Sequence, residues 1–214
     1  MFTIGAAVTL VGLLAHLGAE RAGSFAARAA TKPVASTGFL IAAWGSGAGE
    51  TPWGQAVLAG LALSWVGDVA LLGRGRAAFG AGLGSFLLGH VAFGAAFWLR
   101  GIEWTAAAAA ALVLAGAGAG LWRWLSPRVT GALRPAVAAY IVVILAMVAL
   151  ATGTTAWSPT AWLLAGAVAF AVSDVAVARD RFVAPGFRNR AWGLPLYYGA
   201  QLLLAWGAGA ARVG

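Results

Sequence analysis

The sequence predicts an all-α polytopic membrane protein with eight transmembrane helices. Three observations predict this fold: 62% of the 214 residues are hydrophobic and only 9% are charged, apolar blocks recur along the chain, and basic residues gather in every second gap between the blocks. A soluble domain of this size needs many more polar side chains to cover its surface. Lipid must therefore be the solvent for most of the surface. The net charge of +8 forms no basic stripe, so nucleic acid is not an expected partner.

Each apolar block is long enough to cross a membrane as a helix. A block holds roughly 16 to 21 residues, and about 20 are needed to cross about 30 Å of hydrocarbon at 1.5 Å per residue. The first block has no basic residue ahead of it and no clear cleavage pattern after it, so we expect a span and not a signal peptide. A single integral membrane domain, residues 1–214, is expected. The predicted spans are 3–19, 33–48, 53–73, 79–99, 104–122, 135–153, 160–178 and 192–211.

The basic residues predict the orientation of the spans. Twelve Lys and Arg residues lie in the odd-numbered gaps, and only Arg100 and Arg212 lie in the even gaps and the tails. Basic loops stay in the cytoplasm, so the odd gaps are expected there and both termini outside. One helix more or fewer would break this alternation, which therefore also supports the number of spans. The Arg-rich, Ala-rich and Gly-rich composition is typical of a GC-rich bacterial genome, and we expect a bacterial inner membrane protein.

An internal duplication is indicated by sliding the chain against itself at an offset of 106 residues. Six of fourteen positions match between residues 59–72 and 165–178, and one of the matched pairs is Asp68 with Asp174. Four spans preserve the direction of the chain, so two four-helix halves in parallel orientation are expected. The expected halves are residues 1–103 and 104–214.

Polar side chains inside the predicted spans converge on one depth. Asp68 precedes Arg74 by six residues and Asp174 precedes Arg179 by five, which puts both carboxyl groups about 7 to 9 Å from the cytoplasmic end of their helices. Charge within a bilayer is costly and marks a functional site by default. His16 is placed instead near the outer end of the first span, as a packed or interfacial residue. The other polar residues of the cytoplasmic half are Lys32, Ser36, His90, Tyr140, Tyr197, Tyr198 and Gln201.

This convergence predicts a polar pocket that opens to the cytoplasmic leaflet, and it admits more than one function. Asp68 could pair with Arg74 or Arg181 and only hold helices together. A proton-coupled transporter of a small or lipid substrate is the main alternative to an enzyme, although a carrier needs a site that is reachable from both faces. An intramembrane aspartyl protease fits less well, because only Gly67-Asp68 resembles such sites. One His with two separated Asp has no metal-ligand spacing, so neither a metal nor another cofactor is expected.

These residues, in this order, resemble the sequence blocks of the YhhN family of eight-span membrane proteins, whose animal members are lysoplasmalogenases. The resemblance runs nearly end to end, and its specificity lies in the ordered set and not in any single block. Phe93 stands where a tyrosine often follows the histidine in the family, so that hydroxyl is absent here. The blocks are Lys32-Pro33 at the head of the second span, Gly67-Asp68, the Gly82, Phe86 and His90 ladder, Tyr140, Ser173-Asp174, and Tyr197-Tyr198 with Gln201.

The resemblance implies hydrolysis of the vinyl ether of a 1-alkenyl lysophospholipid, which releases a fatty aldehyde and the glycerophospho-head group. Vinyl ethers cleave when the β-carbon is protonated and water captures the resulting oxocarbenium ion, so the site needs an acid beside a negative charge. Asp68 and Asp174 are the expected pair, without assignment of acid and base, and His90 is expected to orient water or carry the proton. Expected partners are the lysophospholipid, membrane lipid and, as an open alternative, further copies of the chain. The expected substrate-binding residues are Lys32, Ser36, Tyr140, Tyr197, Tyr198 and Gln201.

Overall fold

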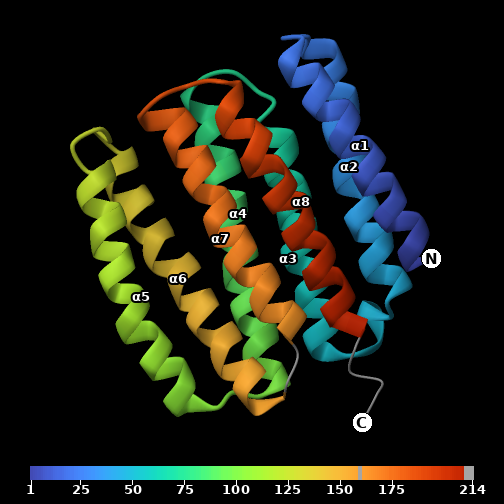
Figure 1. The fold of residues 1–214 in the computed structure, drawn as a ribbon, viewed down its shortest axis with the longest axis vertical. Coiled ribbons are helices and arrows are strands. Elements are labelled where there is room, and N and C mark those ends of the chain that lie inside the picture. The colour runs from blue at the N-terminus through green and yellow to red at the C-terminus, as the bar shows by residue number, and fades with distance from the viewer. Residues whose placement is uncertain (159–160, 210–214) are drawn as a thin grey trace.

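The computed structural model describes residues 1–158 and 161–209, and these residues form eight α-helices and one short 3-10 helix (Figure 1). Each predicted span overlaps one helix; residues 160, 210 and 211 of those spans, and Arg212, lie outside the described residues. The elements are α1 (Phe2–Arg21), α2 (Phe25–Gly45), η1 (Ala48–Glu50), α3 (Pro52–Ala70), α4 (Arg76–Arg100), α5 (Trp104–Leu125), α6 (Leu133–Trp157), α7 (Ala161–Phe182) and α8 (Phe187–Gly209).

Hydropathy separates the helices into two groups. Five of the described helices, α1, α4, α5, α6 and α7, are long and apolar enough to cross a membrane. The chain is therefore an all-helical integral membrane protein, as the composition predicted. That α2, α3 and α8 also cross the bilayer stays a prediction.

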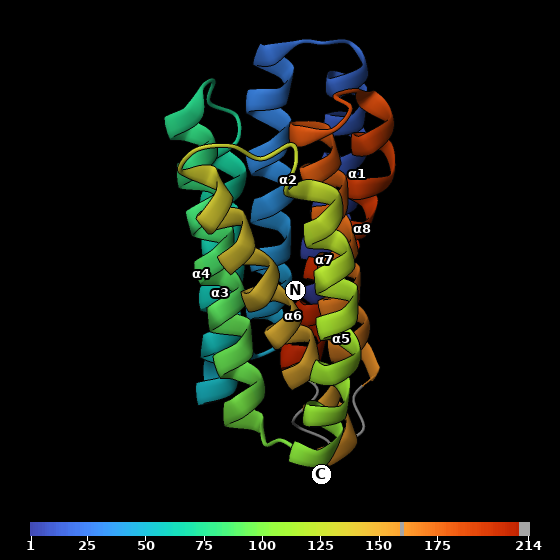
Figure 2. The same ribbon diagram turned by 90° about the vertical axis from the view of Figure 1, so that its left-hand side faces the viewer.

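Consecutive helices pack as antiparallel hairpins, α1 with α2, α3 with α4, α5 with α6, and α7 with α8 (Figures 1 and 2). The hairpins are joined through α8, which packs against α1, α2 and α3, and through α6, which packs against α4 and α7. The α5–α6 hairpin lies at one edge of the bundle (Figure 1). In the predicted duplication, α2 corresponds to α6 and α8 corresponds to α4. The α2–α8 and α4–α6 contacts are therefore equivalent contacts in that arrangement, while the duplication itself stays a prediction.

The loops that follow α1, α3, α5 and α7 all lie at one end of the bundle, the upper end in Figure 1. These loops are the odd-numbered gaps that carry most of the Lys and Arg residues. The basic residues are therefore concentrated at one end of the molecule. Its placement in the cytoplasm remains the prediction made from the positive-inside rule.

Helix α2 begins earlier than the sequence indicated. The Ser24 hydroxyl accepts a hydrogen bond from the backbone N–H of Ala27 and caps the helix, so Lys32-Pro33 lies in its interior. The prediction that this pair opens the second helix is wrong. The charged residues Arg28 and Lys32 made the segment look like a loop, but Lys32 is buried and turns into the bundle. A second basic-Pro pair in the sequence, Arg134-Pro135, lies in the first turn of α6.

Glycines let α1 and α2 approach closely. A Cβ atom added at Gly5 would lie 2.6 Å from the Gly38 carbonyl oxygen and would also clash with the backbone of Ala42. Small residues at such contacts allow helix backbones to pack in a bilayer, where apolar side chains gain little over lipid. The α1–α2 hairpin therefore depends on the absence of a side chain at this position.

The Gly5→Ala variant is expected to lose about 1 to 3 kcal/mol of stability, because the added methyl group forces α1 away from α2. Gly18→Ala is the matched control on the same helix, since a Cβ there meets no atom within 4 Å. Thermal unfolding in detergent, followed by circular dichroism, compares the two. A Gly5→Ala melting temperature equal to that of Gly18→Ala would contradict the packing described here.

Candidate active site

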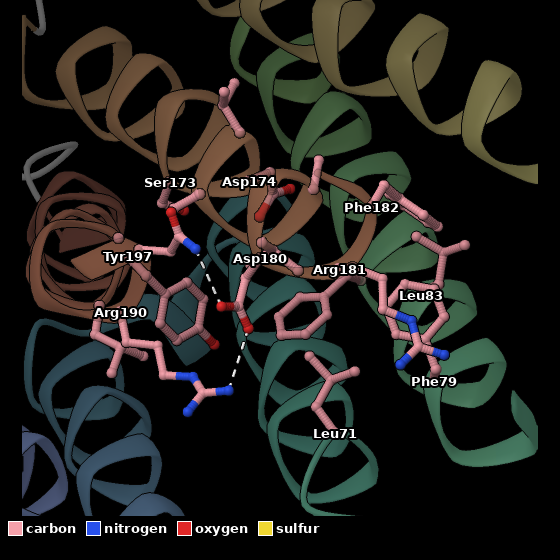
Figure 3. Close-up of a pocket in the computed structure, with 18 of the residues that line it drawn as sticks. Leu71, Phe79, Leu83, Ser173, Asp174, Asp180, Arg181, Phe182, Arg190 and Tyr197 are labelled. Carbon is pink, nitrogen blue, oxygen red and sulfur yellow. Dashed lines mark hydrogen bonds and ion pairs between the residues drawn. The ribbon is translucent and has the colours of Figure 1, made fainter. Parts of the chain in front are cut away.

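A cavity of about 600 Å³ opens at the end of the bundle that carries the basic loops (Figure 3). The chain contains six acidic residues, and four of them line this cavity: Glu20, Asp68, Asp174 and Asp180. Acidic side chains that are so scarce in the sequence and gather in one cavity indicate a functional site. The cations that line the same cavity are Arg28, Lys32, Arg74, Arg181 and Arg190.

Asp68, near the end of α3, is surrounded by donors. Its Oδ2 accepts hydrogen bonds of 2.6 Å from the Ser36 hydroxyl and 2.6 Å from the Tyr197 hydroxyl. Its Oδ1 lies 3.1 Å from Nζ of Lys32, and only 3% of the Asp68 side chain is exposed. The Tyr198 hydroxyl lies 3.3 Å from the Ser36 hydroxyl and donates to the Lys32 carbonyl oxygen at 3.5 Å. A buried carboxylate with a cation and two hydroxyl donors has its charge compensated.

Asp174, on α7, has a different environment. Its Oδ2 accepts a hydrogen bond of 2.6 Å from the Tyr140 hydroxyl and lies 3.6 Å from Nε2 of His90. Asp174 is more accessible than Asp68, with 18% of its side chain exposed, whereas the His90 side chain is fully buried. Nδ1 of His90 lies 2.6 Å from the Phe86 carbonyl oxygen. A carbonyl can only accept, so Nδ1 carries a hydrogen and Nε2 is the atom that faces Asp174.

The two carboxyl groups have partners on helices at matching positions in the order of the chain. Asp68 of α3 receives a donor from α2, Ser36, and another from α8, Tyr197. Asp174 of α7 receives Tyr140 from α6 and faces His90 from α4. Each carboxyl group therefore has one partner on the helix that precedes its own and another on a helix more distant in the chain, α8 for Asp68 and α4 for Asp174. The contributing helices thus hold matching places in the chain, but the side chains that surround Asp68 differ from those that surround Asp174.

Apolar side chains form the side of the cavity near α5 and α6. They come from α4, α5, α6 and α7, and the cavity thus combines a polar side with an apolar side. Such a shape suits an amphiphilic molecule with one hydrocarbon chain. The apolar lining includes Leu83, Leu121, Leu125, Val137, Ile141 and Ile144.

A network of charges joins α1, α2, α7 and α8 at the mouth of the cavity, and Figure 3 shows its Asp180–Arg190 pair. Arg190 of α8 donates to Glu20 of α1 at 2.7 Å and to Asp180 of α7 at 3.2 Å. The Asn189 amide also donates to Asp180, at 3.1 Å, and Arg28 lies 3.5 Å from Glu20. These contacts fix the ends of α1, α7 and α8 around the opening.

His16 lines the cavity beside this network. Its Nδ1 lies 3.1 Å from the Thr31 hydroxyl oxygen and its Nε2 lies 3.6 Å from Glu20. The prediction that His16 lies at the opposite end of its span from the other polar residues is wrong. Helix α1 runs from the N-terminus towards the first basic loop, so a residue five positions before Arg21 lies at the end with the cavity.

The structure brings most of the predicted residues together. Five of them, Lys32, Asp68, Tyr140, Asp174 and Tyr197, line the cavity directly. Ser36, His90 and Tyr198 are buried behind the two carboxyl groups and contact them or their partners. Gln201 is fully buried on α8, and its side-chain amide has no hydrogen-bond partner among the described residues.

The ion pair of Asp68 involves a different cation from the two considered in the sequence. Lys32 is the partner, and no described carboxylate lies within ion-pair distance of Arg74 or Arg181. Residues 1–158 and 161–209 also contain no group of three His, Asp or Glu side chains arranged to hold a metal ion.

Sequence reasoning missed the network at the mouth, formed by Glu20, Asp180, Asn189 and Arg190. Their signal was present in the distribution of acids. Glu50 and Glu103 are the two acidic residues that do not line the cavity, and both lie in even-numbered gaps. Every acidic residue of the basic end thus belongs to the cavity.

The fold and the cavity define an all-helical membrane protein with two carboxyl groups in an amphiphilic cavity. The model of the YhhN family matches residues 27–208, and the chain belongs to the YhhN family. This match covers α3 to α7 completely and confirms the resemblance seen in the sequence.

A curated relative is lysoplasmalogenase TMEM86A of Bos taurus, which is 29% identical over 160 residues. The aligned segment covers 72% of this chain and 65% of the relative, so the chain spans somewhat less than two thirds of that protein. No solved structure is significantly similar to this chain.

Proposed function

We propose that this protein hydrolyses the vinyl ether bond of 1-alkenyl lysophospholipids, giving a fatty aldehyde and the glycerophospho-head group. The observation that carries the proposal is a pair of carboxyl groups in one cavity with opposite surroundings: Asp68 is compensated by Lys32, whereas Asp174 faces a histidine nitrogen. Membership of the YhhN family and the similarity to a protein named lysoplasmalogenase support it.

Asp68 is the ionised member of the pair in this proposal. Its three neighbours within hydrogen-bonding distance, Lys32, Ser36 and Tyr197, are all donors. Donors stabilise a carboxylate relative to the neutral acid. A fixed negative charge at this position would stabilise the oxocarbenium ion that forms when the vinyl ether is protonated.

Asp174 is the proton donor. Because Nδ1 of His90 bonds to the Phe86 carbonyl, a neutral His90 presents a lone pair to Asp174. A carboxylate would repel that lone pair, so the contact is favourable only when the two groups hold one proton between them. Tyr140 donates to the same Oδ2 and fixes the orientation of the carboxyl group. The pair formed by Asp174 and His90 would then deliver this proton to the substrate.

The proposed reaction balances with water as the only second reactant. The Asp174 proton forms a C–H bond at the β-carbon with the π electrons of the double bond, and the adjacent carbon becomes an oxocarbenium centre. Water adds to that carbon and returns one proton to the Asp174 carboxylate, which gives a hemiacetal. The bond to the glycerol oxygen then breaks, that oxygen takes a proton, and the hemiacetal hydroxyl loses one as the aldehyde forms.

Substrate binding follows the two sides of the cavity. The apolar side would take the alkenyl chain, and the polar side the glycerol and head group, with the opening towards the cytoplasmic leaflet. Tyr140 and Tyr197 line the cavity and could contact the glycerol. Lys32 remains a predicted substrate-binding residue, and its ion pair gives it a second role, that of keeping Asp68 charged. Ser36, Tyr198 and Gln201 are buried behind this surface, and their contact with substrate remains a prediction.

Purified protein in detergent is expected to release fatty aldehyde from 1-alkenyl lysophosphatidylcholine or lysophosphatidylethanolamine. The saturated 1-alkyl analogues are the control and should release none, because they have no double bond to protonate. Folded protein that releases no aldehyde from any vinyl ether lysolipid would contradict the proposal. Proton-coupled uptake of a substrate by proteoliposomes under the same conditions would then favour the transporter.

A further inference from the structure

The cations around the cavity differ in whether an acid compensates them. Lys32 pairs with Asp68, while Arg28 and Arg190 share Glu20, and Arg190 also bonds to Asp180. Arg74 and Arg181 line the same cavity without a carboxylate in ion-pair distance among the described residues. The positive charge that remains available to an anionic ligand is therefore on these two arginines.

Arg181 is exposed, and its guanidinium group stacks on an aromatic ring in the wall of the cavity. Its guanidinium carbon lies 4.3 Å from the centre of the Phe79 ring, and Phe79 packs edge-to-face on Phe182 at 5.9 Å. Figure 3 shows Arg181 beside Phe79, away from the Asp180–Arg190 pair. An arginine stacked on an aromatic ring keeps the N–H groups at its edge free to donate.

Arg181 also lies on the face of α7 that carries the proposed proton donor. Asp174, Ala178 and Arg181 follow one another at intervals of four and three residues, and all three line the cavity. The two functional side chains are separated by about 10 Å along the helix axis. In an extended lysophospholipid the β-carbon of the vinyl ether and the phosphorus atom lie roughly 8 Å apart, from bond lengths of about 1.5 Å.

We propose that Arg181 forms a phosphodiester subsite, which holds the phosphate of the substrate while its vinyl ether lies at Asp174. The subsite rests on the proposed function for the identity of the lipid. The guanidinium group donates to two phosphate oxygens from its plane, as arginine does in other phosphate sites. Arg74 lies over the Phe25 ring, 5.6 Å from its centre, and adds charge from the other side of the rim.

The subsite is tested first by binding, which needs no turnover. Unreactive 1-alkyl lysophosphatidylcholine is titrated into wild-type protein, Arg181→Gln and Arg181→Lys in detergent, with calorimetric detection. We expect Arg181→Gln to weaken binding about tenfold and Arg181→Lys to weaken it less. Arg123→Gln is the matched control, since Arg123 lies at the same end of the bundle but does not line the cavity. Binding of 1-alkyl glycerol, which has no phosphate, should be the same in all four proteins.

Equal affinities of wild type and Arg181→Gln for the phospholipid, or equal losses for the phospholipid and the alkyl glycerol, would overturn the subsite. Inorganic phosphate is titrated in a separate experiment. Weak binding of free phosphate supports a subsite for the phosphate of a lipid, whereas binding as tight as that of the lipid would overturn the assignment to a lipid. In turnover experiments, Arg181→Gln should raise KM for 1-alkenyl lysophosphatidylcholine about tenfold and leave kcat/KM for 1-alkenyl glycerol unchanged. The two proposals can fail separately. If wild-type protein releases no aldehyde but Arg181→Gln still weakens lipid binding, the hydrolase is refuted and the phosphate subsite is supported.

Discussion

Asp174→Asn is expected to lower kcat for aldehyde release by about 10² to 10⁴-fold while the affinity for unreactive 1-alkyl lysolipid stays close to that of wild type. The amide keeps the size of the carboxyl group and can still accept the Tyr140 hydrogen bond. It has no acidic proton to give to the β-carbon, so the contribution of general acid catalysis is lost. Single-turnover release of aldehyde separates this effect from that of product release.

The matched control is Asp180→Asn, which replaces a carboxylate by an amide on the same helix and in the same cavity. Its carboxylate is bonded to Arg190 and Asn189 at the mouth and not to the proposed acid. A kcat for Asp174→Asn within a factor of ten of the wild-type value would exclude Asp174 as the proton donor. Equal decreases of kcat in Asp174→Asn and Asp180→Asn would mean that the effect comes from the net charge of the cavity and not from proton donation by Asp174.

The second large effect is expected in stability. Lys32→Met leaves the carboxylate of Asp68 buried without a cation, and Asp68→Asn leaves the Lys32 ammonium without its acid. Breaking a buried ion pair from one side is expected to cost about 3 to 5 kcal/mol, because an uncompensated charge stays in a low-dielectric environment. The double variant, Lys32→Met with Asp68→Asn, removes both charges and is expected to recover most of this loss. Thermal unfolding of the four proteins gives the coupling free energy directly.

Activity provides the complementary part of this cycle. The double variant is expected to fold and to remain inactive, since the fixed negative charge near the oxocarbenium ion is gone. Recovery of wild-type turnover together with stability would make Asp68 a structural residue only. The alternative that was open in the sequence, an ion pair that merely holds helices together, would then describe Asp68 correctly.

Sequence reasoning reached the broad fold because the signals were redundant. Hydropathy, the spacing of the apolar blocks and the alternation of basic gaps all indicated the same helices, and each predicted span overlaps one described α-helix, although α2 begins earlier. The prediction that Asp68 and Asp174 lie in one pocket was also accessible, since acids inside apolar helices are rare. Both now line one cavity.

The partners of these acids could not be predicted with the same ease. Lys32 was placed at a helix end because lysine usually marks a loop, but its side chain turns inward once Ser24 caps the helix a few residues earlier. The contact between Ser36 and Asp68 and that between Tyr140 and Asp174 depend on helix rotation, which a sequence of almost uniformly apolar helices specifies weakly. Hydrophobic periodicity has little contrast when lipid and protein interior are equally apolar.

The crossed arrangement of partners has a consequence for any attempt to divide the chain. Tyr197 in α8 completes the surroundings of Asp68, and His90 in α4 completes those of Asp174. A break in the loop between α4 and α5 would leave each fragment with one acid and with a side chain that contacts the other acid. Neither fragment would hold a complete carboxyl site alone, so whatever chemistry this pair performs requires α1–α4 and α5–α8 to be folded against each other.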